Sequence, residues 1–280
     1  MGDNLMVATS LARWRLIRRF RLRGIEFPIA EFVKPARLTG ILNGHVPDLL
    51  LVPWTDHRGK TCRMMIEFRR PWVALVWLAQ LHTGRHLTFT SPADVYRDMT
   101  GQVSMWGRRM TLTHLPGRPS RMCGHPDGRP KRWWLLPGMA GCACPGTSNH
   151  GWGGAAVDHN TDKGRPVVWL RWLAVWAPLL GYSWEAPSED WHLRYCLGDD
   201  IAPAVMEIES CRAMGSVDVG YRGNNAKLVQ AIVGAKQDGW FGPATKAAVI
   251  VWQTQQQATY VGLRVDGVWD AGCWWIAKAA

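Results

Sequence analysis

Residues 145–158, PGTSNHGWGGAAVD, place His150 and Asp158 close together with only small and apolar residues between them. One interpretation is a turn followed by a short strand, in which the aspartate has a structural role. A second interpretation is that the imidazole and the carboxylate are two ligands of one metal ion. A lone histidine is more often a hydrogen-bonded core residue than a ligand, so the decision depends on the rest of the chain.

A second stretch, residues 188–192 (SEDWH), places Glu189 three residues before His192. A catalytic zinc site commonly takes three ligands from histidine and carboxylate side chains and leaves a fourth position open. His150, Asp158 and His192 form such a set. Glu189 is then the expected general base, which takes a proton from the attacking water and passes it to the leaving amine. Together the two stretches predict one catalytic Zn²⁺ ion.

Two sequence motifs, SNHGWG…AVD and E-x-W-H-L-R-Y, resemble those of the zinc D-alanyl-D-alanine carboxypeptidase (VanY-like) family, which includes many bacteriophage endolysin peptidases. The resemblance covers roughly residues 40–197. It implies an α+β fold of the hedgehog/D-Ala-D-Ala metallopeptidase type, in which a small antiparallel sheet with flanking helices holds the zinc ion. It also implies hydrolysis of an amide bond in the peptidoglycan stem peptide or cross-link. The motifs do not separate carboxypeptidases from endopeptidases.

The resemblance extends to residues that would contact the substrate. Tyr96, Arg97 and Gln102 match the family's Tyr-Arg-Ser…Gln segment, and the first and last of these are expected to bind substrate. The Arg97 guanidinium would stabilise developing oxyanion charge or bind a terminal carboxylate. An ordinary helix salt bridge is the alternative for Arg97. Ser148 would position the substrate or the adjacent histidine, with turn capping as its alternative.

One spacing departs from the family pattern, because His150 and Asp158 are separated by one additional residue. In a strand, an added residue would turn the carboxylate to the opposite face. The addition falls near Gly153–Gly154, where a bulge or loose turn can absorb it. We therefore expect Asp158 to be the ligand. Asp162 is the first alternative and His159 the second.

The C-terminal segment contains a short sequence pattern twice, which we call the internal echo. The stretches QDGWFGPAT (237–245) and VDGVWDAGCW (265–274) each contain an Asp-Gly turn, an aromatic residue and the start of a helix. Between them, the spacing predicts a helix over 244–255 with one apolar face formed by Ala247, Ala248, Val251 and Trp252.

This segment resembles the type 1 peptidoglycan-binding domain, a three-helix bundle, although Asp270 stands where that family commonly has glycine. The resemblance implies that exposed turns and aromatic residues bind the wall polymer, with Asp238, Trp240 and Trp269 as the candidate contacts. The alternative is that these aromatic residues only pack the turns onto the helices.

Composition shifts divide the chain into a basic N-terminal extension (1–40), a zinc peptidase domain (41–210) and a peptidoglycan-binding domain (216–280). In the extension, Leu11, Trp14 and Ile17 could form one stripe of a short amphipathic helix. Within the peptidase domain, the patterns predict helices at 71–80, 94–109 and 167–180, a strand at 86–90, and a surface excursion at 115–145.

The net charge of +11 favours an anionic partner: nucleic acid, an acidic membrane surface or a cell wall. No nucleic-acid-binding motif is recognised, so bacterial peptidoglycan is the expected partner of a monomeric enzyme. No apolar run approaches the roughly 18 residues that span a bilayer, and arginines interrupt the basic N-terminus. We therefore expect a product of the host cytoplasm that acts on the wall after release, which in phage systems requires a holin.

Seven cysteines are scattered along the chain, an odd number that does not suggest a disulfide framework. Free thiols are expected. A structural zinc site formed by Cys123, His125, Cys142 and Cys144 is the alternative, although its spacing matches no standard zinc knuckle. A different class of function is also open: a non-catalytic wall-binding protein whose peptidase domain is degenerate.

Overall fold

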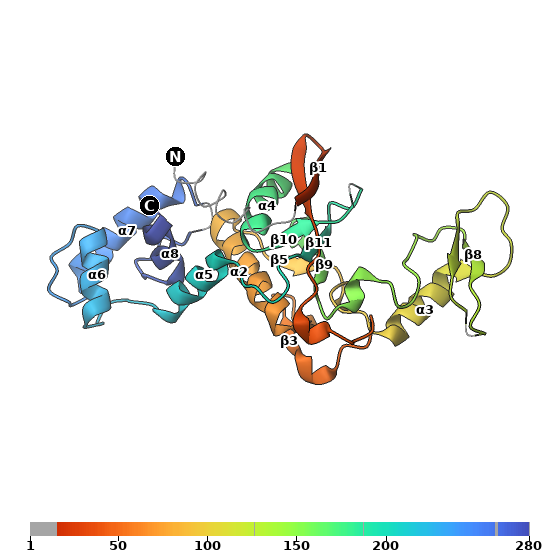
Figure 1. Ribbon diagram of the computed structural model, residues 1–280. Coiled ribbons are helices and arrows are strands. Elements are labelled where there is room, and N and C mark those ends of the chain that lie inside the picture. Colours follow the sequence, from red (N-terminus) through yellow and green to blue (C-terminus); the bar gives the residue numbers. More distant parts are fainter. Residues whose placement is uncertain (1–15, 126, 187, 261–262, 280) are drawn as a thin grey trace.

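A mixed six-stranded sheet organises the chain in the computed structural model, which describes residues 16–125, 127–186, 188–260 and 263–279 (Figure 1). The strand order is β1-β2-β10-β11-β9-β5. The strands are β1 (Leu16–Leu22), β2 (Ile25–Ala30), β5 (Leu87–Phe89), β9 (Ala156–Thr161), β10 (Tyr182–Trp184) and β11 (His192–Tyr195). The α+β class is confirmed. The expected antiparallel sheet is found only in part, because β2 and β10 pair in parallel.

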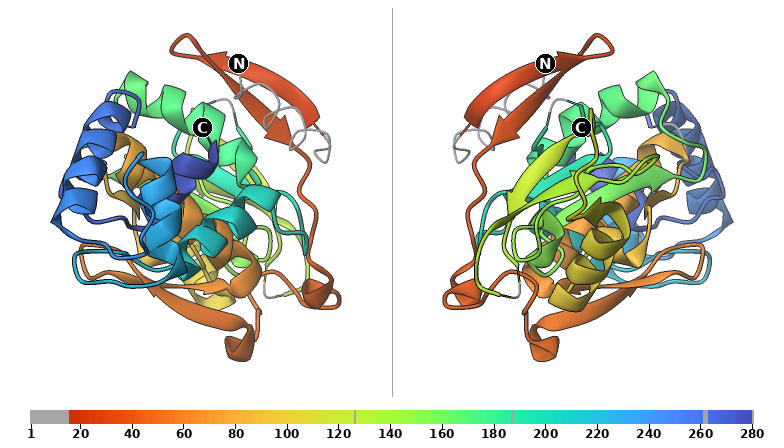
Figure 2. Two further views of the ribbon diagram at one scale, coloured as in Figure 1. Left: turned by 90° about the vertical axis from the view of Figure 1, so that its left-hand side faces the viewer. Right: turned by 90° about the vertical axis from the view of Figure 1, so that its right-hand side faces the viewer.

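The parallel pair results from the N-terminal hairpin, which belongs to the sheet. β1 and β2 join through Arg23 and Gly24, both at positive φ (51° and 74°), as a tight hairpin turn requires. The ring of Phe27 on β2 is fully buried and lies 4.6 Å from the ring of Trp184 on β10. Residues 25–30 therefore join the main sheet, although the predicted boundary at residue 40 assigns them to the N-terminal extension. Figure 2 shows this hairpin at the outer edge of the molecule.

The amphipathic helix expected near the N-terminus is not supported by the described residues. Ile17 lies in strand β1, while Leu11 and Trp14 lie outside the described residues. Pairing along the β2 edge satisfies backbone groups of β1, and this long-range contact is invisible to local periodicity.

Helices α2 (Ile66–Thr83) and α4 (Val167–Leu179) pack against the sheet and against each other, and α5 (Pro203–Ala213) packs against α2. The expected helices at 71–80 and 167–180 are confirmed as α2 and α4, and the expected strand at 86–90 is β5. Gly84 ends α2 in the left-handed conformation at φ 62°. Among the described residues, no helix combines the length and apolar character needed to cross a bilayer.

Helix α3 (Met99–Arg109) begins later than the expected residue 94. The Asp98 side chain accepts a hydrogen bond from Gly101 N at 2.7 Å and caps the helix. The preceding Pro92–Asp94 forms a separate 3₁₀ turn. A hairpin of β3 (Leu51–Thr55) and β4 (Thr61–Met65) precedes α2.

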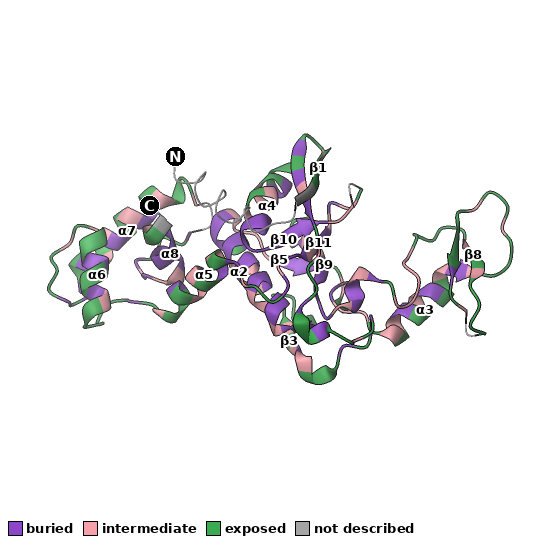
Figure 3. Ribbon diagram, viewed as in Figure 1, coloured by how far each residue is buried: buried purple, intermediate pink, exposed green. Residues whose placement is uncertain are grey.

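The expected surface excursion at 115–145 carries a small lobe formed by β6 (Met110–Thr111), β7 (Ser120–Cys123) and β8 (Lys131–Leu135). The lobe projects from the end of α3 and is largely exposed in Figure 3. Its core is small and consists of Trp106, Met110 and Cys123, with partly buried neighbours. The cysteines of the chain are free thiols, as expected.

The C-terminal helices are α6 (Asn224–Ile232), α7 (Pro243–Gln257) and α8 (Ala271–Ala279). Two buried glutamines organise the two echoed turns. Gln230 accepts from Gly239 N at 3.0 Å, and Gln253 accepts from Gly267 N at 2.9 Å. Each glutamine also donates to a carbonyl of its turn. The sequence echo is therefore a structural repeat.

This repeat corrects the expected face of α7. The helix buries Thr245, Val249 and Gln253, whereas Val251 is 57% exposed. Of the predicted apolar face, Trp252 packs against Trp269 with ring centroids 4.6 Å apart. The buried face is shifted from the predicted one because Gln253 turns inward to bind the turn backbone.

Aromatic side chains join the C-terminal helices to the main domain. The His82 ring on α2 packs against Trp176 on α4, Trp275 on α8 and Tyr260. Its Nδ1 accepts a hydrogen bond from Trp172 Nε1 at 3.2 Å. Burial lowers the pKa of His82 to about 4, so the ring is neutral at pH 7.

This burial makes the folded state sensitive to acid. Below the unfolded-state pKa of about 6.5, the unfolded chain protonates His82, while the folded chain resists protonation down to about pH 4. We expect His82 to reduce the free energy of unfolding by about 2 kcal/mol between about pH 7 and about pH 5. His82→Phe keeps the aromatic packing and should remove this component in urea unfolding. The exposed control His114→Phe should not, and equal acid dependence in both variants would contradict the assignment.

Candidate metal centre

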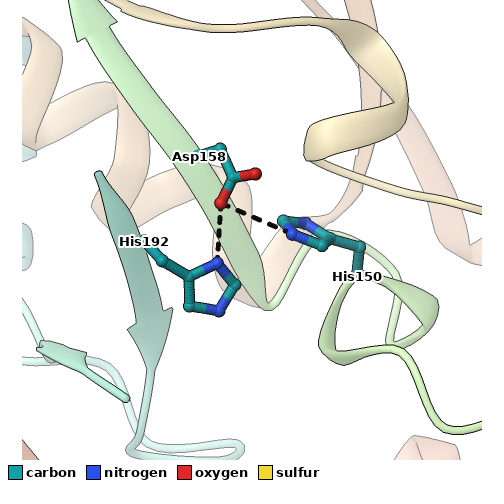
Figure 4. Close-up of side chains that lie close together, drawn as sticks. All are labelled: His150, Asp158 and His192. Atoms are coloured by element: carbon teal, nitrogen blue, oxygen red, sulfur yellow. Dashed lines mark hydrogen bonds and ion pairs between the residues drawn. The ribbon is translucent and has the colours of Figure 1, made fainter. Parts of the chain in front are cut away.

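Two neighbouring strands and one turn present the predicted ligands. His150 lies in the 3₁₀ turn η4 (Asn149–Gly151), Asp158 on β9, and His192 at the start of β11. The antiparallel pairing of β9 and β11 places His192 directly opposite Asp158. Directly opposed residues project on the same face of a sheet, so the register brings these ligands together (Figure 4).

The three side chains converge on one oxygen of Asp158. His192 Nδ1 lies 2.6 Å from Asp158 Oδ1, and His150 Nε2 lies 3.5 Å from the same oxygen. The two imidazole rings stand nearly perpendicular, with centroids 5.0 Å apart. In the described part of the chain, this is the one group of three or more ligating side chains whose atoms lie within 4.8 Å of one another. The buried group can hold a metal ion, and two imidazoles with one carboxylate suit zinc among other divalent cations.

Two glycines precede the strand that carries Asp158. Gly153 and Gly154 adopt left-handed conformations at φ 64° and 89°. A Cβ would lie 2.9 Å from Met65 Cγ at the first glycine and 3.0 Å from Met64 Cβ at the second. The turn that they form precedes β9 and lets the strand present Asp158 to the site.

The alternative ligands lie elsewhere. Asp162 is exposed and accepts a hydrogen bond from His86 N at 3.1 Å. His159 is fully buried, and its Nε2 lies 3.0 Å from the carbonyl oxygen of Asp190. His159 follows Asp158 on the strand and therefore points to the opposite face.

Hydrogen bonds between the carboxylates and the imidazoles shift the pKa values of Asp158 and His192. Burial raises the pKa of Asp158, but its hydrogen bonds with His150 and His192 outweigh burial and hold that pKa well below the ordinary value. Burial lowers the pKa of His192, but its hydrogen bonds with Asp158 and Glu185 outweigh burial and raise that pKa to about 9. The two carboxylates thus favour positive charge at this place, which a bound cation would supply.

Glu189 lies in the turn that leads into β11 but outside the close group. Its main chain joins the turn, since Glu189 N donates to Ala186 O and its carbonyl accepts from His192 N at 3.1 Å. Among the residues that the structure describes, its partly buried carboxylate has no hydrogen-bond or ion-pair partner. The carboxylate is therefore available to a water molecule or substrate.

Arg97 and Ser148 lie beside the ligand segment. Arg97 N donates to His150 O at 3.0 Å, and its guanidinium pairs with Asp94 at 2.9 Å. The same guanidinium lies 3.5 Å from Ser148 Oγ. The salt bridge that was the alternative for Arg97 thus exists, and it holds the guanidinium next to the ligand segment. The Ser148 side chain makes no capping hydrogen bond to η4.

Tyr96 and Gln102 differ in solvent exposure. Tyr96 is partly buried and lines, together with Arg97 and Arg63, a cavity of about 440 Å³. Gln102 is only 3% exposed, donates to Asn43 Oδ1 at 2.9 Å and accepts from Gly146 N at 2.8 Å. Both ends of the Gln102 amide thus support the loop before Ser148, and little of the side chain is open to a substrate.

Asn43 and Glu185 are site residues that the sequence analysis missed. Asn43 Nδ2 donates to Ser148 O at 2.7 Å and supports the first ligand segment. Glu185 Oε2 lies 2.5 Å from His192 Nε2. The sequence feature that could have identified Glu185 is its place directly after the apolar stretch that forms β10. No sequence feature pointed to Asn43.

The alternative zinc site in the small lobe does not form in the described structure. His125 Nδ1 lies 3.0 Å from Asp127 Oδ1, and Cys123, Cys142 and Cys144 do not join it in a ligand group. Burial, together with the neighbouring Cys144 thiol, raises the pKa of Cys123 to about 12, so this thiol is protonated.

Of the predicted wall contacts, Trp240 and Asp238 are exposed and Trp269 is buried. Trp240 is 41% exposed, with the Arg222 guanidinium 5.3 Å from its ring. Asp238 Oδ1 accepts from Trp240 N at 3.0 Å and shapes the turn. Trp269 is fully buried, so a direct wall contact by this residue is wrong. In the structural repeat it corresponds to the equally buried Phe241.

Asp270, which departs from the glycine of the resembled family, has a local role. Its Oδ1 accepts from Gly272 N at 2.8 Å and from Cys273 N at 3.1 Å. An aspartate here caps the start of α8.

Comparisons of the chain with protein families, curated proteins and solved structures gave no match.

Loss of Asp158 should remove the bound metal. After incubation with zinc and gel filtration, we expect about one zinc ion per chain in the unmodified protein and little in Asp158→Ala, because the remaining imidazoles are two ligands of the three that such a site needs. Elemental analysis measures both. The control Asp162→Ala should keep its zinc. Equal zinc contents in the two variants would refute Asp158 as a ligand.

Proposed function

We propose that the chain is a zinc peptidase that hydrolyses an amide bond in the peptidoglycan stem peptide or cross-link. The observation that carries the proposal is the convergence of His150, Asp158 and His192 on one buried point. These are the residues that the sequence motifs single out as ligands. The substrate class rests on the resemblance of those motifs to peptidoglycan peptidases.

The residues have separate roles in this proposal. His150, Asp158 and His192 would hold a zinc ion, which supplies Lewis acidity toward a carbonyl and a water molecule. Glu189 would accept a proton from the attacking water and return it to the leaving amine. Its lack of a partner in the described structure supports this exchange. Arg97, held by Asp94, would stabilise the oxygen of the substrate carbonyl.

The C-terminal segment would hold the enzyme on the bacterial cell wall. Trp240 is exposed on a turn that Gln230 and Asp238 make rigid. A rigid exposed aromatic residue suits the apolar faces of a sugar polymer. The net charge of +11 would favour association of a monomer with an anionic wall.

Glu189→Gln tests the mechanism. The variant should keep its zinc, since Glu189 is not a ligand, and should release fragments from purified peptidoglycan at least about 100-fold more slowly. The control Glu207→Gln, on the remote helix α5, should retain full activity. Mass spectrometry of the fragments identifies the bond that is cut.

Two outcomes would contradict the proposal in different ways. Normal fragment release by Glu189→Gln would refute the general base. Wall binding without fragment release by the zinc-loaded unmodified protein would favour the non-catalytic wall-binding alternative.

A further inference from the structure

We propose that Glu185 is a positioning residue of the metal site: its carboxylate holds the His192 ring so that Nδ1 faces the metal position. The inference rests on the proposed metal-dependent function. It assigns a role to a glutamate that neither sequence motif includes.

The contacts of His192 define the role. Its Nε2 lies 2.5 Å from Glu185 Oε2, and its Nδ1 lies 2.6 Å from Asp158 Oδ1. The ring is only 6% exposed, so water cannot readily replace either contact. An imidazole that ligates a metal through one nitrogen carries its proton on the other, and a carboxylate that accepts this proton fixes both tautomer and ring orientation. Nδ1 faces the other two ligands, so Nε2–H is the donor to Glu185.

Glu185 is itself fixed from both ligand segments. Its Oε2 accepts from Asn149 Nδ2 at 2.7 Å, and Asn149 directly precedes the ligand His150. Its Oε1 pairs with Arg194, two residues after His192 on β11. The Arg194 guanidinium in turn lies over the Phe32 ring, 3.7 Å from the centroid. Glu185 thus connects the turn that carries His150 to the strand that carries His192.

The structure distinguishes Glu185 from Glu189 by their partners. Three donors engage the Glu185 carboxylate, which is 19% exposed. A carboxylate held in this way orients a ligand but has little freedom to exchange protons with a water molecule. Glu189 has no partner among the described residues and keeps that freedom. One glutamate therefore positions the site, and the other is the proposed base.

Zinc affinity provides the first test. The metal-free protein and its variants are titrated with zinc in competition with a chromophoric chelator. We expect Glu185→Gln to raise the zinc Kd by about 10- to 100-fold, because the amide cannot anchor Arg194 and His192 together as the carboxylate does. Glu189→Gln is the matched control and should change the Kd by less than about twofold. An unchanged Kd in Glu185→Gln would overturn the inference.

Activity at saturating zinc provides the second test. If Glu185 acts only by positioning His192, excess zinc should restore most of the kcat of Glu185→Gln but not that of Glu189→Gln. A kcat that stays as low as that of Glu189→Gln would overturn the positioning role. Circular dichroism of the metal-free variants shows whether they fold. If Glu185→Gln does not fold, Asn149→Ala replaces it, and this variant should raise the zinc Kd because it releases one side of the Glu185 carboxylate.

The affinity test does not depend on peptidase activity. Unmodified protein that binds zinc but releases no wall fragments would refute the proposed function and leave the Kd comparison valid. Protein that binds zinc equally well with and without Glu185 would refute the inference alone.

Discussion

The pairing register of β9 and β11 is the constraint on which the candidate site depends. It sets His192 opposite Asp158, and a shift by one residue would turn one of the two side chains to the other face of the sheet. The neighbouring residues show the effect, since His159 follows Asp158 and lies in the core on the opposite face. The sheet thus fixes two ligands, and the η4 turn has only to bring His150 to them.

Polar contacts around the ligands make this arrangement rigid. Asn43 and Gln102 use their amides to hold the loop before Ser148, and Glu185 bridges the turn of the first ligand to the strand of the last. Buried polar groups that are fully hydrogen-bonded specify one conformation, whereas unpaired ones are costly. Glu189 differs, because among the described residues its carboxylate has no hydrogen-bond or ion-pair partner, which suits a group that exchanges protons.

Much of the fold and of the site could be predicted from local patterns. Helices α2 and α4 follow from long apolar runs ended by glycine, and the ligands follow from two short motifs. The differences from the predictions have a common physical cause. Trp269 and Gln102 are residue types that also bind ligands, but packing and backbone hydrogen bonds bury both in the protein. Burial depends on partners far along the chain, which one-dimensional spacing does not reveal.

The sequence by itself determined which side chains can ligate a metal, and it located the glycine pair that precedes Asp158. These are local properties, because residue chemistry and positive φ belong to single positions. Only the tertiary structure decided that residues 25–30 belong to the sheet and that Glu185 contacts His192. These outcomes depend on strand pairing and side-chain packing between distant segments, and those interactions exist only once the chain has folded.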